Sequence, residues 1–140
     1  MASESTLCII KPDAVEGRHQ AKIIQRIIDE GFAIEGLKQL RLERSVAEGF
    51  YAVHRERPFF GELVEYMTSG PVIVIALRRE NAVAHWRQVI GATNPEKADA
   101  GTLRKQFGKS LTANALHGSD SPENGLRETA YFFTGAELGR

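Results

Sequence analysis

The segment at 72–77 (VIVIAL), which follows Gly70-Pro71, constrains the fold more than any other part of the sequence. It is short, unbroken and rich in β-branched residues, so it predicts a central strand that is covered on at least one face. A second apolar run at 6–10 (TLCII) is stopped by Lys11-Pro12 and predicts another buried strand. The chain therefore needs a sheet, and other segments have to cover it.

Helical periodicity appears directly after the first run. Residues 21–30 (AKIIQRIIDE) place four isoleucines on one helical face, and Gly31 provides a C-terminal cap. Residues 32–42 alternate in part and predict a further strand. Ser45 with Glu48 three residues later has the form of a capping box, which predicts the start of a helix.

The remaining segments continue this mixture of helices and strands. We expect helices starting at Pro58, at Asn81 and at Ser121-Pro122 (the last with Leu126, Ala130 and Phe133 on its apolar face), a loop at 91–101, a short helix at 103–107 and a strand end at 114–118. This order predicts an α+β fold, with one sheet and helices mainly on one face.

Composition narrows the class of protein. The 140 residues, 42% of them hydrophobic, suit one globular domain, and 18 basic against 18 acidic residues disfavour bulk attraction to nucleic acid or an anionic membrane. One cysteine, Cys8, excludes an internal disulfide, and no zinc-ligand spacing occurs. The apolar runs are far shorter than the roughly 20 residues of a membrane span. With no signal-peptide pattern at the N-terminus, these features predict a cytoplasmic protein.

The usual Gly-rich phosphate signatures are absent. Gly108-Lys109-Ser110 resembles the end of a P-loop, but that pattern needs glycine at position 103, which is Leu103. No G-x-G-x-x-G motif follows a strand. A phosphate-binding protein of this sequence would hold its ligand with side chains.

The segment 114–120 (NALHGSD) holds the main candidate for chemistry. His117 ends an expected strand, and Gly118 leaves room for a ligand and a tight turn. Neutral imidazole is a good nucleophile near pH 7. The alternative is a turn histidine that is only hydrogen-bonded; His19, His54 and His85 are weaker candidates. The groups that could orient the His117 ring are Ser119, Asp120, Glu123 and Glu128.

Several other side chains suit phosphate or base binding. Lys11 follows the first strand, and Arg87 and Arg104 flank the 91–101 loop, although each also fits a solvated surface cation. Arginine is suited to bidentate phosphate contacts. Thr93 and Asn94 can add neutral donors. Of Phe59 and Phe60, one ring is expected in the core and the other could stack on a base, and Tyr51 is either a core residue or a hydroxyl donor.

These motifs, taken together, resemble the nucleoside diphosphate kinase family over nearly the whole chain. The similar segments are IIKPDAV at 9–15, ERPFF at 56–60, MTSGPV at 67–72, GATNP at 91–95, GT-R at 101–104, N-x-x-HGSD at 114–120 and ETAYFF near the end. The rival class is a non-catalytic ferredoxin-like binding module, but such a module is expected to lose His117 or its phosphate-binding cations. Ala21 and Lys22 depart from the family pattern outside the reacting set.

The resemblance implies a ping-pong transfer of the terminal phosphoryl group from a nucleoside triphosphate to a nucleoside diphosphate, through a phosphohistidine on Nδ1 of His117. It implies that Lys11 and Asn114 bind the sugar hydroxyls, that Lys11 also approaches the phosphoryl group, and that Phe59 stacks on the base. It further implies that Arg87, Thr93 and Arg104 bind phosphates and that Tyr51 lies beside His117. Ser119 and Glu128 would support the site, with Glu128 reaching the His117 ring from the last helix. Mg²⁺ would bind mainly through the nucleotide phosphates, which requires no dedicated carboxylate cage.

The resemblance also implies a ferredoxin-like β-α-β-β-α-β core with extra helices, in one domain over 1–140, and assembly into a homo-tetramer or homo-hexamer. Because no residue that reads base edges is evident, broad base specificity follows as a hypothesis. The sequence leaves open the preferred nucleoside pair, the choice between tetramer and hexamer, and any side activity on DNA or proteins.

Overall fold

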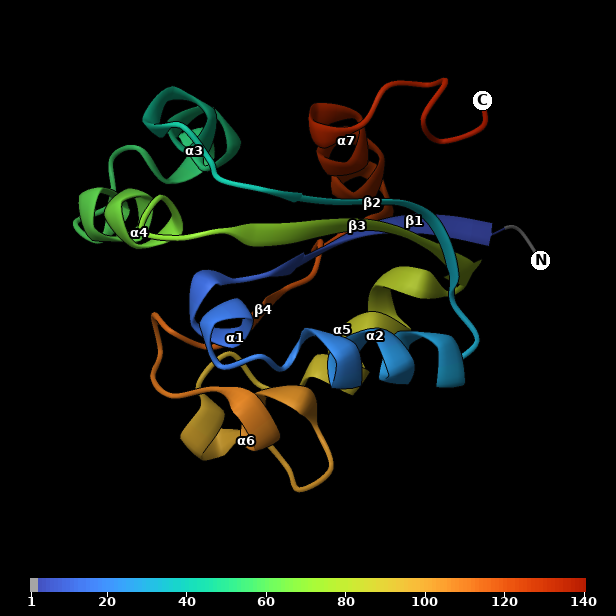
Figure 1. Cartoon of the computed structure of the whole chain (residues 1–140), viewed down its shortest axis with the longest axis horizontal. Helices are drawn as coiled ribbons and strands as arrows, with labels where there is room; N and C mark the ends of the chain where they lie inside the picture. Colours follow the sequence, from blue (N-terminus) through green and yellow to red (C-terminus); the bar gives the residue numbers. More distant parts are fainter. Residues whose placement is uncertain (1–2) are drawn as a thin grey trace.

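The computed structural model describes residues 3–140, which form a four-stranded sheet with helices on both faces (Figure 1). The elements in chain order are β1 (Ser3–Ile10), α1 (Pro12–Glu16), α2 (Gln20–Asp29), β2 (Ala33–Leu40), α3 (Arg44–Phe50), the 3₁₀ turn η1 (Ala52–His54), α4 (Phe60–Met67), β3 (Val72–Glu80), α5 (Ala82–Ile90), the 3₁₀ turn η2 (Pro95–Lys97), α6 (Leu103–Phe107), β4 (Leu116–His117) and α7 (Pro122–Phe132). No helix in this part of the chain has the length and apolar character that crossing a membrane needs. The prediction that the N-terminus carries no signal peptide includes residues 1 and 2, which lie outside the described residues.

The strands run antiparallel to their neighbours in the order β2-β3-β1-β4. The segment 72–77 lies in β3, which pairs with β1 on one side and β2 on the other, so the predicted central strand is confirmed. β4 contributes one short pairing to β1, with His117 opposite Ile9. The α+β, ferredoxin-like fold class is confirmed.

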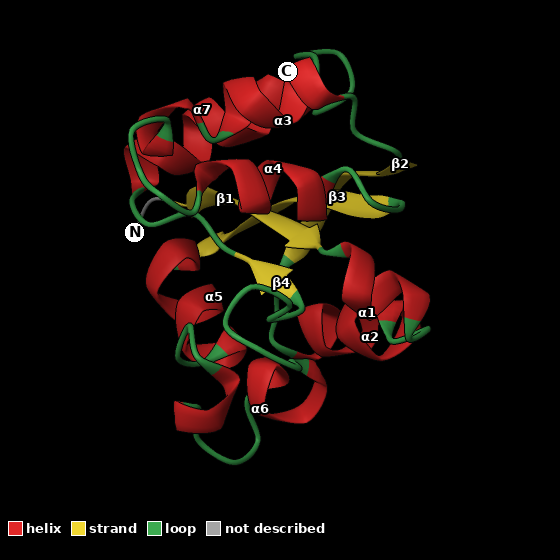
Figure 2. Cartoon of the chain, turned by 90° about the vertical axis from the view of Figure 1, so that its left-hand side faces the viewer, coloured by secondary structure: helices red, strands yellow, loops and turns green. Residues whose placement is uncertain are grey.

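Both faces of the sheet are covered, which corrects the expectation of helices mainly on one face (Figure 2). Cys8 and Ile10 of β1 pack in one hydrophobic cluster with α2 and α5, whereas Leu7 and Ile9 pack in a second cluster with α3, α4 and α7. The physical reason lies in the sequence of β1 and β3. Their apolar runs are continuous, so side chains on both faces have to be buried.

Two predicted helix starts are wrong. Ser45 is not an N-cap, because α3 already begins at Arg44 with Glu43 in the cap position and no side-chain cap hydrogen bond. Pro58 lies in a turn, and α4 begins two residues later at Phe60. In contrast, Ser121 caps α7 as predicted, and its Oγ accepts a hydrogen bond of 3.1 Å from the Asn124 N–H. The five-residue α1 was not predicted.

The predicted apolar face of α7 is also wrong. Leu126 is 54% exposed and Ala130 is exposed, while the helix turns Gly125, Glu128 and Thr129 toward the sheet. Phe133, the third predicted member, is buried at the end of the helix. The helix lies so close to β1 that only glycine fits at its second turn. α7 therefore packs on the sheet through the close approach at Gly125 and the buried Glu128 carboxylate, and not through an apolar stripe.

We predict that Gly125→Ala lowers the free energy of unfolding by about 1–3 kcal/mol, because overpacking forces a backbone shift. A Cβ atom at Gly125 would lie 1.9 Å from the Ser5 carbonyl oxygen, which belongs to the central part of the sheet. Gly61→Ala in α4 is the matched control, since no atom lies within 4 Å of its added Cβ. Denaturant unfolding should show no loss for Gly61→Ala. Wild-type stability of Gly125→Ala would contradict the close approach.

Candidate active site

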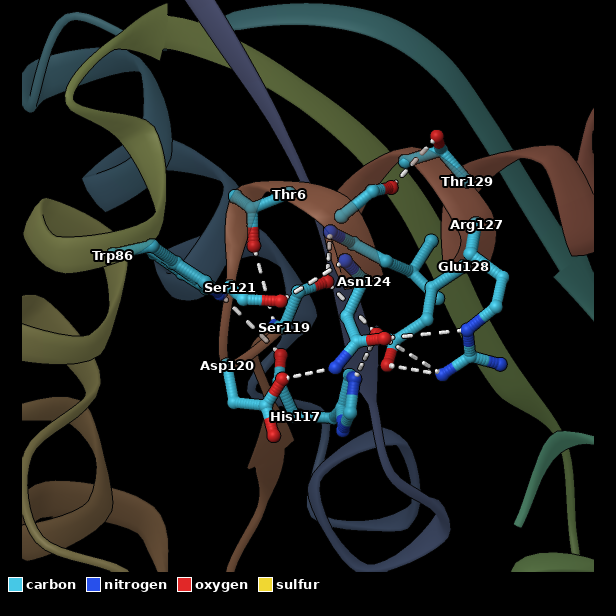
Figure 3. A network of polar contacts seen from close by, with 12 residues as sticks. Thr6, Trp86, His117, Ser119, Asp120, Ser121, Asn124, Arg127, Glu128 and Thr129 are labelled. Atoms are coloured by element: carbon cyan, nitrogen blue, oxygen red, sulfur yellow. Dashed lines mark hydrogen bonds and ion pairs between the residues drawn. The ribbon is translucent and has the colours of Figure 1, made fainter. Parts of the chain in front are cut away.

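His117 is held at its ring by a buried carboxylate (Figure 3). Its Nε2 lies 2.7 Å from Oε1 of Glu128, which projects from α7. The Ser119 hydroxyl donates to the same oxygen at 2.8 Å and accepts from the Leu7 N–H at 3.0 Å. Since an ionised carboxylate only accepts hydrogen bonds, Nε2 carries the ring proton. Nδ1 is then left with its lone pair, which is the requirement for a nucleophile.

The turn after His117 packs against Trp86 of α5. Trp86 Nε1 donates to the His117 carbonyl oxygen at 3.3 Å, and a Cβ on Gly118 would lie 2.9 Å from the Trp86 ring. The Ser119 N–H donates to Thr6 Oγ1 at 3.2 Å. Glycine is needed at 118 because the indole ring occupies the space of a side chain. The backbone that follows the His117 ring is therefore anchored.

The turn before His117 is strained. Ala115 has φ of +76°, and the Leu116 N–H donates to the Asn114 carbonyl oxygen at 2.9 Å, which closes a three-residue turn. The Ala115 carbonyl oxygen accepts from the Lys11 N–H at 2.8 Å. A non-glycine residue at positive φ costs on the order of 1–3 kcal/mol, and such residues cluster at functional sites. Here the turn brings the Asn114 side chain beside Lys11.

Lys11 and Asn114 form a buried polar pair. The Lys11 ammonium donates to Asn114 Oδ1 at 2.8 Å, and Asn114 Nδ2 donates to the Thr93 carbonyl oxygen at 3.1 Å. Lys11 is only 8% exposed. Its burial, and next the positive charge of Arg104, lower the pKa of Lys11 to about 8. The charged form is thus held in the site at a cost.

Arg104 and Arg87 bring two more cations to the same region. The Arg104 guanidinium donates to the carbonyl oxygens of Gly91 and Leu116 at 3.1 and 2.7 Å. Burial, and then the charge of Arg87, lower the pKa of Arg104 to about 10. Arg87 itself is exposed on α5. Two like charges in one region favour a bound anion.

Three adjoining cavities make one cleft. A cavity of about 340 Å³ beside Phe59 and a cavity of about 500 Å³ share Thr93 in their walls. The second cavity shares Arg87 and Gly118 with a third, of about 300 Å³, which reaches His117. The cleft therefore leads from an exposed aromatic ring, past an amide and three cations, to the unprotonated nitrogen of an imidazole.

The site residues predicted from the sequence come together in or behind this cleft. The residues in its walls are Lys11, Tyr51, Phe59, Arg87, Thr93, Arg104, Asn114, His117 and Glu128. Ser119 lies behind the cleft, fully buried against Glu128. Burial, and then the Glu128 charge, raise the pKa of the Tyr51 hydroxyl, which has no hydrogen-bond partner among residues 3–140. Of the four groups considered for orienting the ring, Glu128 contacts it.

Sequence reasoning missed several contributors. Trp86 was expected only as an apolar helix residue, and Asn124 and Arg127 in the wall of the His117 cavity carried no signal. The weaker histidines differ in place: His19 stacks on Phe107 at 4.4 Å, His85 lies 2.8 Å from Glu30, and His54 lines the same cavity as His117. Cys8 is buried, and burial raises the pKa of its thiol, as expected for a small hydrophobic residue.

No dedicated metal cage is evident in the described residues. Among residues 3–140, no group of three or more His, Cys, Asp or Glu side chains is placed to hold a metal ion. The donors that line the 500 Å³ cavity are cationic or neutral, apart from Asp99. This donor set fits a metal ion that is carried by the oxygens of a bound polyanion.

Comparison with known proteins gives a consistent result. The family model described as nucleoside diphosphate kinase matches residues 4–138. The chain is 54% identical to a nucleoside diphosphate kinase of Pelobacter propionicus over 96% of this chain and 98% of the relative, and 54% identical to one of Sorangium cellulosum over 99% and 96%.

Solved structures agree with these matches. The nucleoside diphosphate kinase of Aquifex aeolicus superposes with a TM-score of 0.95 at 47% identity, covering 97% of this chain and 99% of that one. A halophilic nucleoside diphosphate kinase from Halobacterium salinarum in complex with CDP gives 0.93 at 36% identity, covering 97% and 91%. Sequence, fold and cleft thus lead to one conclusion: the chain belongs to the nucleoside diphosphate kinase family.

Proposed function

We propose that this enzyme moves the terminal phosphoryl group of a nucleoside triphosphate onto a nucleoside diphosphate through Nδ1 of His117. One observation carries the proposal: the Nε2–Glu128 contact of 2.7 Å leaves Nδ1 unprotonated at the end of a cleft lined by cations. A binding module has no need of an imidazole held in one tautomer by a buried carboxylate.

The chemistry runs in two matching halves. In the first, the Nδ1 lone pair attacks the γ-phosphorus, the bond from phosphorus to the bridging β–γ oxygen breaks, and the nucleoside diphosphate leaves with that electron pair. In the second, a terminal oxygen of an acceptor diphosphate attacks the same phosphorus, and Nδ1 recovers its pair. The proton stays on Nε2 throughout, donated to the Glu128 carboxylate, which stabilises the positive charge that the ring acquires.

The cations provide most of the stabilisation of the transferring group. Charge in phosphoryl transfer lies on the equatorial oxygens, so guanidinium and ammonium donors held in place are effective. We assign phosphate binding to Arg87, Arg104 and Thr93, and the sugar hydroxyls to Lys11 and Asn114, with Lys11 reaching the phosphoryl group as well. Tyr51 lies in the cavity of His117, where its hydroxyl stays protonated.

The base has a tolerant binding place. Phe59 is 47% exposed and lines the 340 Å³ cavity together with Leu63 and Leu111. Aromatic stacking accepts any base and is worth roughly 1–3 kcal/mol. Broad base specificity follows from stacking between apolar walls. Sugar and phosphate contacts, which all nucleotides share, would then provide the common part of recognition.

Members of this family generally use a divalent metal ion. We propose that Mg²⁺ enters with the nucleotide and neutralises phosphate oxygens, since the cleft offers cations and amides in place of a carboxylate cage. Because its substrates are nucleotides, we also assign the enzyme to the cytoplasm.

A homo-oligomer, tetramer or hexamer, is part of the same proposal. β2 lies at the edge of the sheet and leaves its outer edge unpaired within the described chain, with Leu37 exposed there. Such an edge is suited to pairing with a second copy. The mass of the native assembly in solution measures this.

We predict that His117→Ala abolishes acid-labile, base-stable labelling by γ-labelled ATP while the fold is retained. In the unaltered enzyme, any nucleoside diphosphate should remove the label. His54→Ala is the control, because His54 lines the same cavity but has no assigned role. Retained transfer in His117→Ala would falsify the assignment of the nucleophile.

The two arginines are expected to differ in one respect. Arg87→Ala should weaken nucleotide binding by about 1.5–3 kcal/mol with an unchanged Tm, because Arg87 is exposed. Arg104→Ala should weaken binding and also lower Tm, because its guanidinium holds the Gly91 and Leu116 carbonyl oxygens. Calorimetric titration and thermal unfolding measure both, with Arg44→Ala on the outer surface of α3 as control. If nucleotide affinity is unchanged in both variants, Arg87 and Arg104 do not bind phosphate.

Stability and activity should respond to pH in opposite directions through Lys11. The folded enzyme releases the Lys11 proton near pH 8, whereas the unfolded chain keeps it up to about 10.5. Between these values the unfolded chain binds more protons, so the free energy of unfolding rises with pH, by up to about 3 kcal/mol. Turnover falls over the same range as the ammonium is lost.

Lys11→Gln has no such proton and isolates the effect. Denaturant unfolding of both proteins from pH 8 upward should show the wild type gaining stability relative to the variant. A wild-type minus variant difference that stays constant over this range would contradict the buried, charged lysine.

A further inference from the structure

Asp13 lies two residues beyond Lys11, in the first turn of α1, and is only 7% exposed. The Tyr66 hydroxyl of α4 donates to its Oδ1, while the Asp13 N–H donates to the same hydroxyl oxygen at 3.2 Å. Its other oxygen, Oδ2, has no hydrogen-bond partner among the described residues. The carboxylate is therefore buried, held from one side by a tyrosine, and unused on the other.

Lys11, in turn, lacks an acidic hydrogen-bond partner among residues 3–140. Its ammonium has three N–H donors, and the partner that the structure shows is the neutral Asn114 amide. The positive charge of Arg104 lowers the pKa of Lys11 further, and the charge of Arg87 acts on Arg104 in the same way. Burying a cation among cations is costly unless a counter-charge is near.

We propose that Asp13 is a positioning residue, the buried counter-charge that keeps Lys11 an ammonium, and that Tyr66 holds the Asp13 carboxylate so that the Lys11 N–H groups remain available to the nucleotide. The inference rests on the role proposed above for Lys11. Asp13 acts through Lys11 and touches no substrate itself.

The electrostatics of both groups agree with this arrangement. Burial and Arg104 lower the pKa of Lys11, and the Asp13 charge works against them by raising it. Burial raises the pKa of Asp13, while its own backbone, Lys11, the backbone of Ala115 and Lys109 lower it. Glu62, which lines the same cavity as Lys11, is exposed to solvent.

The hydrogen bond from Tyr66 explains how one carboxylate can balance the charge without consuming the donors. A carboxylate paired directly with Lys11 would compete with the nucleotide for the same N–H groups. The Tyr66 hydroxyl donates to Oδ1 and so holds the carboxylate against α4, while the charge of Asp13 still raises the pKa of Lys11. α4 also follows directly on Phe59, so one helix supports both the base cavity and the counter-charge.

The test is the pH dependence of Lys11 itself. In Asp13→Asn, the alkaline limb of kcat/KM is expected to move about one pH unit lower, as for loss of a nearby opposite charge. Tyr66→Phe keeps the carboxylate, so its limb should not move lower, although KM should rise. Glu16→Gln, an exposed acid at the end of α1, is the matched control and should leave the limb in place.

A second readout needs no catalysis. Titration of the Lys11 side chain by NMR in ¹³C-lysine-labelled protein, assigned with Lys11→Arg, should show the same downward shift in Asp13→Asn. Asp13→Ser is the second charge-removing variant if the asparagine form does not fold. Because this titration uses the free protein, it stands even if His117 proves not to carry the phosphoryl group.

Two results would overturn the proposal. One is an unmoved Lys11 titration in the variants that lack the carboxylate. The other is an equal downward shift in Asp13→Asn and Tyr66→Phe, which would mean that lost packing, and not lost charge, changes Lys11.

Discussion

The contact between the Glu128 carboxylate and Nε2 of His117 is the interaction on which the site depends. It joins the last helix to the edge strand, and Ser119 extends it to the Leu7 N–H in the middle of the sheet. To bring that carboxylate within reach, α7 has to lie against β1 with a polar side inward. Gly125 permits the approach, and Leu126 is left in solvent. The orientation of a whole helix therefore follows from the need to hold one imidazole.

The second constraint is positive charge. Burial lowers the pKa of Lys11 and of Arg104, and a neighbouring cation lowers each pKa further, so the cleft is an unfavourable place for positive charge. Two hydrophobic clusters, one on each face of the sheet, stabilise the fold and offset the cost of burying these cations. A polyphosphate relieves the repulsion when it binds. The same donors then stabilise a transferring phosphoryl group without having to reorganise.

The sequence allowed most of the fold to be predicted wherever burial is continuous. The runs at 6–10 and 72–77 lie in β1 and β3, because short, continuous apolar segments are suited to strands that are buried on both faces. Local rules failed where a tertiary contact overrides them, as at Ser45 and on the apolar face expected for α7. The residues around His117 left four groups that could orient its ring, and the family resemblance favoured Glu128; the path of α7 brings the Glu128 carboxylate to Nε2. Asp13 lies in the segment 9–15 that carries the resemblance, but no role could be predicted for it, because a buried counter-charge has no sequence period.

The order of residues along the cleft also bears on why one cleft can serve two nucleotides in turn. The cavities run from Phe59 through Thr93 and the arginines to His117. In the proposed binding mode, each of these residues would contact a part of the nucleotide that donor and acceptor share. The phosphoryl group stays on the enzyme while the first diphosphate leaves, and the vacated contacts suit the next one. In the proposed mechanism Lys11 has to be charged in both halves of the cycle, because the departing and the incoming diphosphate make the same contacts and a neutral amine would bind both more weakly than an ammonium does. A fixed counter-charge inside the protein meets that requirement better than substrate does, since substrate is absent for part of every turnover.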